Sequence, residues 1–300
     1  MDIQQAYYEW RFEIAFLREK GDGFEALFDK LMGLAYKGDY IPTRPWGRDG
    51  DRKNDGYLRS ERRLFQVYAP NELKATNAIS KMTEDFAGAK KHWEAYFDKW
   101  VFVHNADQGL PPHVVEKIVE IAQNNPEIEV STWSWIELID VFRRISVVDK
   151  EGWFGLAPTE ATKSKIGFAD LKIVLESIAD RSPPLNSEVR DVPAGKIEAN
   201  ALSESVATLL RQGMTKTQMV DVFLSQWHDE SLGERIAGAF NSKYLELKEQ
   251  YTPNAIFTEL QTWAGGEELG SPEHQLAVLT ILAYYFESCE IFEEPKGATQ

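Results

Sequence analysis

Near the start of the chain, hydrophobic residues recur with the spacing of an amphipathic helix. The stripe runs through residues 6–36, is clearest over Phe24 to Leu34, and is interrupted at Gly21-Asp22-Gly23. The pattern predicts a broken helix that ends near Tyr36. The turn residues Lys37-Gly38-Asp39 follow, and then the proline- and aromatic-rich segment YIPTRPWG, which predicts extended or loop structure.

Strand and helix patterns then alternate along the chain. Short runs rich in β-branched and aromatic residues predict strands over 54–58, 63–69, 99–105 and 128–132. Helical spacing predicts helices over 77–93, 113–125 and 134–145. This order predicts an α/β domain, with a mixed sheet sandwiched by helices, that closes near residue 150.

After residue 150 the pattern becomes helical. We interpret Gly152 to Gly155 as a loop, 167–178 as a helix and SPPLNSEVRDVPAGK as a linker. Beyond Ile197, five helical runs follow, the last opened by Ser271 at the cap and Pro272 at the first position. We therefore expect an α/β domain over 1–150, a connecting segment with one helix over 151–196, and an all-helical domain over 197–300.

Composition places the chain among soluble globular proteins, with 43% hydrophobic and 27% charged residues. It has no apolar run long enough to cross a bilayer and no secretion signal at its start, so we expect a cytoplasmic protein without a membrane partner. The one cysteine and five scattered histidines lack zinc-site spacing. Motifs for nucleotide hydrolysis, dinucleotide binding, zinc proteolysis and serine hydrolysis are also absent from the sequence.

Charge is distributed unevenly along the chain. The net charge is -15; residues 1–150 hold 21 Lys and Arg against 25 Asp and Glu, and residues 151–300 hold 12 against 23. Within the first half, residues 44–63 hold seven basic and four acidic residues. Arg44, Arg48 and Arg52 could contact nucleic-acid phosphates there, although a solvated basic loop would have the same composition. The acidic second half is better suited to a protein partner than to DNA.

An acidic turn, GRDGDRKNDGY, is the strongest candidate for chemistry. A metal-dependent phosphodiesterase needs carboxylates that converge on Mg²⁺ from adjacent elements, and the chain offers Glu25 on a helix, Asp51 and Asp55 in the turn, and Gln66 on the following strand. Each residue also has an ordinary interpretation. The aspartates suit hairpin geometry, Glu25 suits the start of a helix, and Gln66 could be a buried glutamine bonded to backbone.

The segments FEALFDKLMGLAY, GRDGDRKNDGY and LFQVYAP, with the helices and strands after them, resemble the restriction-endonuclease-like fold of the PD-(D/E)xK superfamily over residues 20–147. The resemblance implies that Asp55 is the principal metal ligand and that Gln66 holds the second position. The sequence departs from the motif at Tyr68, where a lysine is expected. Lys53 and Lys74 are the nearest bases that could replace it.

A narrower resemblance is to nuclease-like subunits of bacterial ABC-three-component systems. It is carried by KNDGY at 53–57, QVYAP at 66–70 and LAYYFESCEIFEEP at 282–295. The resemblance implies a role in defence against mobile DNA, with an ATPase of the structural-maintenance type as partner.

These observations lead to three hypotheses. The first is a nuclease that uses Mg²⁺ or Mn²⁺ to hydrolyse DNA, with the helical domain docked to a partner. The second is a non-catalytic DNA-binding or assembly adaptor, in which catalysis has been lost and Tyr68 stands in place of the catalytic lysine. The third is a purely structural scaffold. Metal dependence distinguishes the first from the others. The sequence does not fix the oligomeric state, which leaves a homo-oligomer open.

Overall fold

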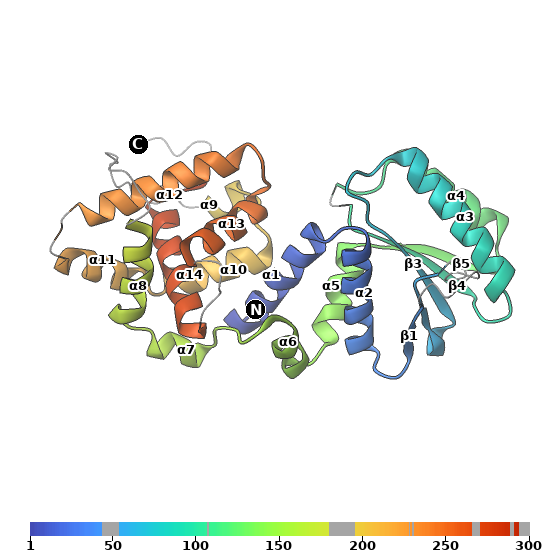
Figure 1. Cartoon of the computed structure of the whole chain (residues 1–300), viewed down its shortest axis with the longest axis horizontal. Helices are drawn as coiled ribbons and strands as arrows, with labels where there is room; N and C mark the ends of the chain where they lie inside the picture. The colour runs from blue at the N-terminus through green and yellow to red at the C-terminus, as the bar shows by residue number, and fades with distance from the viewer. Residues whose placement is uncertain are drawn as a thin grey trace. The chain divides into compact units, whose positions relative to one another are not determined.

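The chain folds into two compact units, seen in a computed structural model that describes residues 1–43, 54–106, 108–179, 196–227, 229, 231–265, 271–288 and 291–293. Arg11–Trp153 form one, termed the α/β unit, and Met1–Trp10 with Phe154–Gln300 form the other, termed the helical unit (Figure 1). The first helix, α1 (Ile3–Arg18), begins in the helical unit and ends in the α/β unit. The domain boundaries expected from the sequence stay a prediction.

The α/β unit is built on a five-stranded mixed sheet; the sequence predicted a mixed sheet with four of these strands, and the fifth comes from residues 40–42 of the segment predicted to be extended or loop. Its strands, β1 (Tyr40–Pro42), β2 (Gly56–Leu58), β3 (Arg63–Tyr68), β4 (Lys99–His104) and β5 (Glu129–Trp133), are hydrogen-bonded in chain order. The first three pair antiparallel, and β3, β4 and β5 pair parallel. Arg62 adopts the left-handed conformation, φ 50°, in the tight turn between β2 and β3. The carboxyl ends of β3 and β4 therefore lie at one edge of the sheet.

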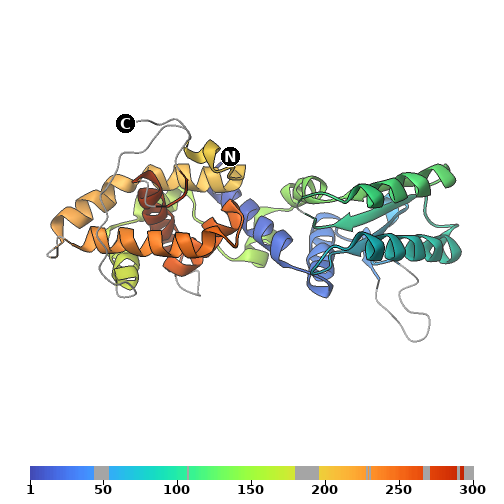
Figure 2. The same ribbon diagram turned by 90° about the horizontal axis from the view of Figure 1, so that it is seen from above.

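Helices cover both faces of this sheet. On one face α3 (Ala75–Trp93) and α4 (Pro112–Asn124) lie side by side (Figures 1 and 2). They cover a core that contains Leu64, Trp100 and Phe102. On the other face lie α2 (Asp22–Ala35) and α5 (Trp135–Arg144), where Phe65 of β3 packs against Phe28 of α2. Alternate residues of β3 thus point to opposite cores, as the pleat of a strand requires.

Where the pattern predicted a loop, at Gly152 to Gly155, the structure has the end of α6 (Val147–Phe154). Gly155 follows it with φ 81°, a left-handed conformation that ends the helix, so the glycine marks a helix stop rather than a longer loop. The described residues of the segment 151–196 contain two complete helices, α7 (Glu160–Lys165) and α8 (Phe168–Ala179), where one was expected. Thr159 caps α7 by accepting a hydrogen bond from the Thr162 backbone, a local signal that helical spacing alone does not reveal.

The helical unit surrounds one buried helix, α14 (Pro272–Glu287), which contacts α7, α8, α10, α11 and α13. Ser271 caps α14 as predicted, because its side chain accepts from the His274 backbone. The apolar side chains of α14 are buried on all sides, which is typical of a central helix. The other helices from 196 onward are α9 (Lys196–Ala199), α10 (Glu204–Met214), α11 (Thr217–Gln226), α12 (Leu232–Lys248) and α13 (Pro253–Gly265).

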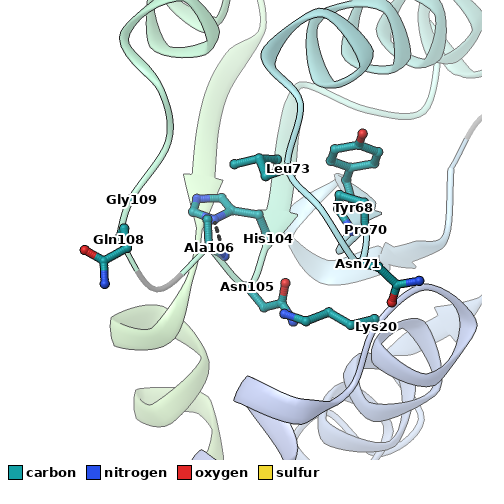
Figure 3. Close-up of a pocket in the computed structure, with 10 residues that line it drawn as sticks. All are labelled: Lys20, Tyr68, Pro70, Asn71, Leu73, His104, Asn105, Ala106, Gln108 and Gly109. Atoms are coloured by element: carbon teal, nitrogen blue, oxygen red, sulfur yellow. Dashed lines mark hydrogen bonds between the residues drawn. The ribbon is translucent and has the colours of Figure 1, made fainter. Parts of the chain in front are cut away.

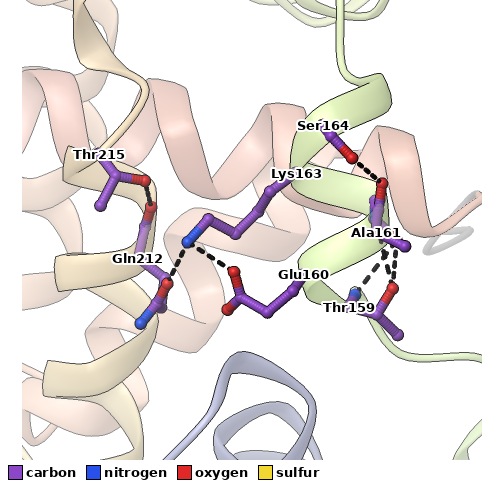
Figure 4. Close-up of polar contacts among 8 residues, drawn as sticks. Thr159, Glu160, Ala161, Lys163, Ser164, Gln212 and Thr215 are labelled. Carbon is purple, nitrogen blue, oxygen red and sulfur yellow. Dashed lines mark hydrogen bonds and ion pairs between the residues drawn. The ribbon is translucent and has the colours of Figure 1, made fainter.

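Polar contacts join further elements of the helical unit. Lys163 of α7 donates to Gln212 Oε1 of α10 at 2.7 Å and pairs with Glu160 at 3.1 Å (Figure 4). The indole of Trp10, in α1, donates to Thr258 Oγ1 of α13 at 3.1 Å, and both groups are buried. The first residues of the chain are thereby part of the helical core. Among the helices that the structure describes, none is long and apolar enough to span a bilayer.

Candidate functional site

Asp55 and Gln66, two of the residues predicted from sequence, lie together in the β2–β3 hairpin. The hairpin pairs Gly56 with Phe65, so the preceding and following residues, Asp55 and Gln66, come opposite one another. Asp55 Oδ2 accepts a hydrogen bond from Gln66 Nε2 at 2.6 Å and another from the Val67 backbone N–H at 2.6 Å. Asp55 is 7% exposed and Gln66 is 2% exposed. The hairpin therefore holds a carboxylate and an amide in a fixed, buried geometry.

The Gln66 amide is only half satisfied. Its nitrogen donates to Asp55, while its Oε1 is buried and accepts no hydrogen bond from any residue that the structure describes. Buried polar atoms in folded proteins nearly always have a partner, so this oxygen needs an explanation. A hard cation takes oxygen ligands of this kind, and Mg²⁺ commonly binds through one or two carboxylates together with substrate phosphates. The Asp55–Gln66 pair therefore fits part of a Mg²⁺ site.

The start of the hairpin is fixed by a close packing contact. The Tyr40 ring of β1 lies so near Gly56 that a Cβ there would be 2.6 Å from Tyr40 Cε2. Only glycine leaves room for this approach, which explains the glycine after Asp55. The Tyr40 hydroxyl donates to Asp29 Oδ1 on α2 at 2.6 Å. Asp29 is an acid near the hairpin that sequence reasoning missed; it lies one turn after Glu25, on the same face of α2.

Of the other predicted acids and bases, the structure describes two, Glu25 and Lys74. Glu25 lies in the first turn of α2, whose preceding Gly21 donates to the Ala69 carbonyl after β3 at 2.7 Å. Lys74 is exposed and pairs with Glu72 at 3.1 Å. The remaining candidates, Asp51, Lys53, Arg44, Arg48 and Arg52, lie outside the described residues. Within the part of the chain that the structure describes, no three His, Cys, Asp or Glu side chains form a metal-ligand set.

Tyr68, which stands where the resemblance expects lysine, ends β3 beside a pocket. Burial raises its pKa, and the nearby charge of Lys81 only partly opposes the shift, so the phenol is neutral at neutral pH. In the parallel register Tyr68 pairs with His104 at the end of β4. A pocket of about 260 Å³ opens here, and it is lined in part by Lys20, Leu73 and Asn105 (Figure 3).

Sequence reasoning missed this pocket because it treated His104 as an ordinary histidine. One signal was present: a polar His-Asn pair comes directly after the apolar run Trp100 to Val103. Ligands of sheets with parallel strands bind outside the carboxyl ends of those strands, which is where His104 and Asn105 lie. Lys20 had no such signal, because only the fold brings the α1–α2 connection to this edge.

Comparison with known protein families gives a match in the second half of the chain. Residues 169–293 match the family model of C-terminal domain 10 of the ABC-three component (ABC-3C) systems. The matched residues lie within the helical unit, and the match places the chain in such a system. Neither the curated proteins nor the solved structures include a match to this chain. The resemblance to ABC-three-component systems is therefore confirmed through the helical unit, whereas the restriction-endonuclease-like resemblance of residues 20–147 stays a prediction.

Proposed function

Because its helical unit carries a C-terminal domain of an ABC-three-component defence system, we propose that this chain is the nuclease-like component of that system and hydrolyses phosphodiester bonds of DNA under the control of a partner. The observation that carries the proposal is the buried Asp55–Gln66 pair, in which an amide oxygen without a donor lies beside a carboxylate. A solvated hairpin gives no reason for such an arrangement, because a buried unsatisfied oxygen costs stability.

In this proposal Asp55 and Gln66 hold Mg²⁺ or Mn²⁺, with Asp51 or Glu25 as a further acid. The metal, when bound, would supply an activated water and stabilise the charge that develops on the phosphate. The backbone N–H of Val67 keeps the Asp55 carboxylate in place. Lys53 or Lys74 would provide the cation that Tyr68 cannot, by orienting water or steadying the phosphate.

The two parts of the chain would meet different partners. Arg44, Arg48 and Arg52 fall in the locally basic segment 44–63 and would contact DNA phosphates. Residues 151–300, with 12 basic against 23 acidic residues, would repel DNA and instead dock a protein, which we propose is the ATPase of the system.

The test is cleavage of plasmid and linear DNA with Mg²⁺ or Mn²⁺, by the purified chain alone and together with the other components of its system. Asp55→Asn is the informative variant, because it removes the charge and keeps the shape. Asp140→Asn is the matched control, since Asp140 is an exposed acid of α5 in the same unit. We expect metal-dependent cleavage that Asp55→Asn abolishes and Asp140→Asn retains. Equal cleavage by all three proteins would contradict the proposal.

A non-catalytic DNA-binding or assembly adaptor is the second candidate, and Tyr68 is the observation that favours it. A neutral phenol at the lysine position removes the charge that stabilises a phosphodiester transition state. The adaptor hypothesis predicts no cleavage even with all components present. In a gel-shift assay it predicts that the chain retains DNA to the same extent with and without metal, and that Asp55→Asn retains as much DNA as the wild type. A nuclease would instead show tighter, metal-dependent retention of uncleavable DNA by the wild-type chain.

A further inference from the structure

The pocket at the carboxyl ends of β3 and β4 contains two polar groups that the fold prepares for a ligand. His104 and Asn105 are each 5% exposed, and both line the pocket (Figure 3). Neither residue belongs to the Asp55–Gln66 pair. Two buried polar side chains at a pocket wall, on the rigid end of a strand, are typical of a ligand-binding site.

His104 presents a hydrogen-bond donor. Burial lowers its pKa to about 4, with the Glu137 carboxylate opposing the shift, so the ring is neutral at neutral pH. Its Nδ1 accepts from the Ala106 backbone N–H at 3.3 Å, which assigns the ring proton to Nε2. No described residue bonds to Nε2. The neutral N–H group is therefore left for a ligand.

Asn105 presents an acceptor. Its Nδ2 donates to the carbonyl oxygens of Phe16, at 3.1 Å, and Glu19, at 2.8 Å. Since both neighbours are acceptors, the orientation of the amide is fixed, and Oδ1 is the atom without a hydrogen bond from any described residue. The pocket thus offers one fixed donor and one fixed acceptor from adjacent residues.

The remaining walls narrow the class of ligand. The aromatic ring of Tyr68 and the side chain of Leu73 provide an apolar surface on which a planar group can lie, and Lys20 adds a cation. An inorganic anion is a poor fit, because the Asn105 oxygen would repel it and the His104 ring carries no charge. It would also fill little of about 260 Å³. A nucleotide has a planar base with donors and acceptors at its edge and a phosphate for the lysine.

We propose that this pocket binds a nucleotide, with the base against Tyr68, His104 and Asn105 and the phosphate at Lys20. The nucleotide could be free in solution or an unpaired nucleotide of a strand, and the chemistry of recognition is the same for both. The proposal does not rest on nuclease activity, since binding is measured without metal and without cleavage.

The test is isothermal titration of the full chain, in EDTA, with each deoxynucleoside monophosphate, the matching deoxynucleosides and inorganic phosphate. We expect at least one monophosphate to bind and inorganic phosphate to bind far more weakly. Lys20→Met should weaken the monophosphate and leave the deoxynucleoside unchanged. His104→Phe should weaken both by about tenfold, the effect of one lost hydrogen bond in a buried site. His113→Phe, at an exposed histidine of α4, is the matched control and should bind as the wild type does.

Titration with a short single-stranded oligonucleotide and its duplex separates the two sources. If the natural ligand is an unpaired nucleotide of a strand, the single strand should bind more tightly than the monophosphate. If the natural ligand is a free nucleotide, the oligonucleotide should not displace the bound monophosphate. Absence of binding by every monophosphate and by the single strand would overturn the proposal. So would equal affinity for inorganic phosphate, or unchanged binding in both His104→Phe and Lys20→Met. If His104→Phe failed to fold, Lys20→Met would decide the outcome alone.

Discussion

Replacing Asp55 by alanine should destabilise the α/β unit strongly, whatever its chemistry. The carboxylate accepts two buried hydrogen bonds of 2.6 Å, from Gln66 Nε2 and from the Val67 N–H. Removing it leaves both donors buried without an acceptor, and each such donor costs about 1–3 kcal/mol. The expected loss is therefore about 2–6 kcal/mol, a large part of the stability of an ordinary domain. Both bonds are accepted by Oδ2, so the amide oxygen of Asp55→Asn can take that position, and this variant should lose less stability than Asp55→Ala.

Hydrogen exchange measured by mass spectrometry suits this prediction, because a chain of two units has no single free energy of unfolding. The quantity compared is the free energy of opening for peptides that contain β3, in the wild type, Asp55→Ala and Asp55→Asn. Peptides of α14, in the helical unit, report whether the effect stays local, and Asp140→Asn serves as the surface control. A loss below about 1 kcal/mol in Asp55→Ala would show that these two bonds contribute little, and would refute the reasoning from buried donors.

Three further predictions follow from single contacts. Gly56→Ala should destabilise the hairpin by about 1–3 kcal/mol, because the new methyl group overlaps the tyrosine ring of β1. Hydrogen exchange of β2 and β3 peptides measures this loss. Gly33→Ala is the control, because a Cβ at Gly33 meets nothing within 4 Å. Folding lowers the pKa of His104 from 6.5 to about 4, so between these values the unfolded chain binds a proton that the folded chain does not, and stability should fall by about 3 kcal/mol as pH drops through this window. The free energy of opening of β4 peptides, measured by hydrogen exchange between pH 4 and 7, should vary less with pH in His104→Phe than in the wild type, and an equal pH dependence would contradict the assignment. Thr258→Val should cost the helical unit about 1–3 kcal/mol, because it removes the acceptor of the buried Trp10 indole N–H; unchanged exchange protection of α13 would argue against that contribution.

The sequence by itself determined the order and type of most elements. Helical spacing and short runs of β-branched and aromatic residues predicted most of the helices and four of the five strands of the mixed sheet, because both signals are local to each element. The cap of α14 was visible in the same way, since Ser271 and Pro272 act on the turn that follows them. Asp55 and Gln66 were both candidates from the sequence, and the hairpin, which pairs residues near one another in the chain, brings them opposite one another.

Only the tertiary structure decided which distant residues meet. The Gln66 oxygen is without a donor, and Asp29 approaches the hairpin through Tyr40, for reasons of packing that no pattern records. Lys20 joins His104 at one pocket because parallel strands align their carboxyl ends at one sheet edge, and a neighbouring connection then closes over that edge. Such contacts depend on how separate elements pack, whereas periodicity records only which side of each element is buried.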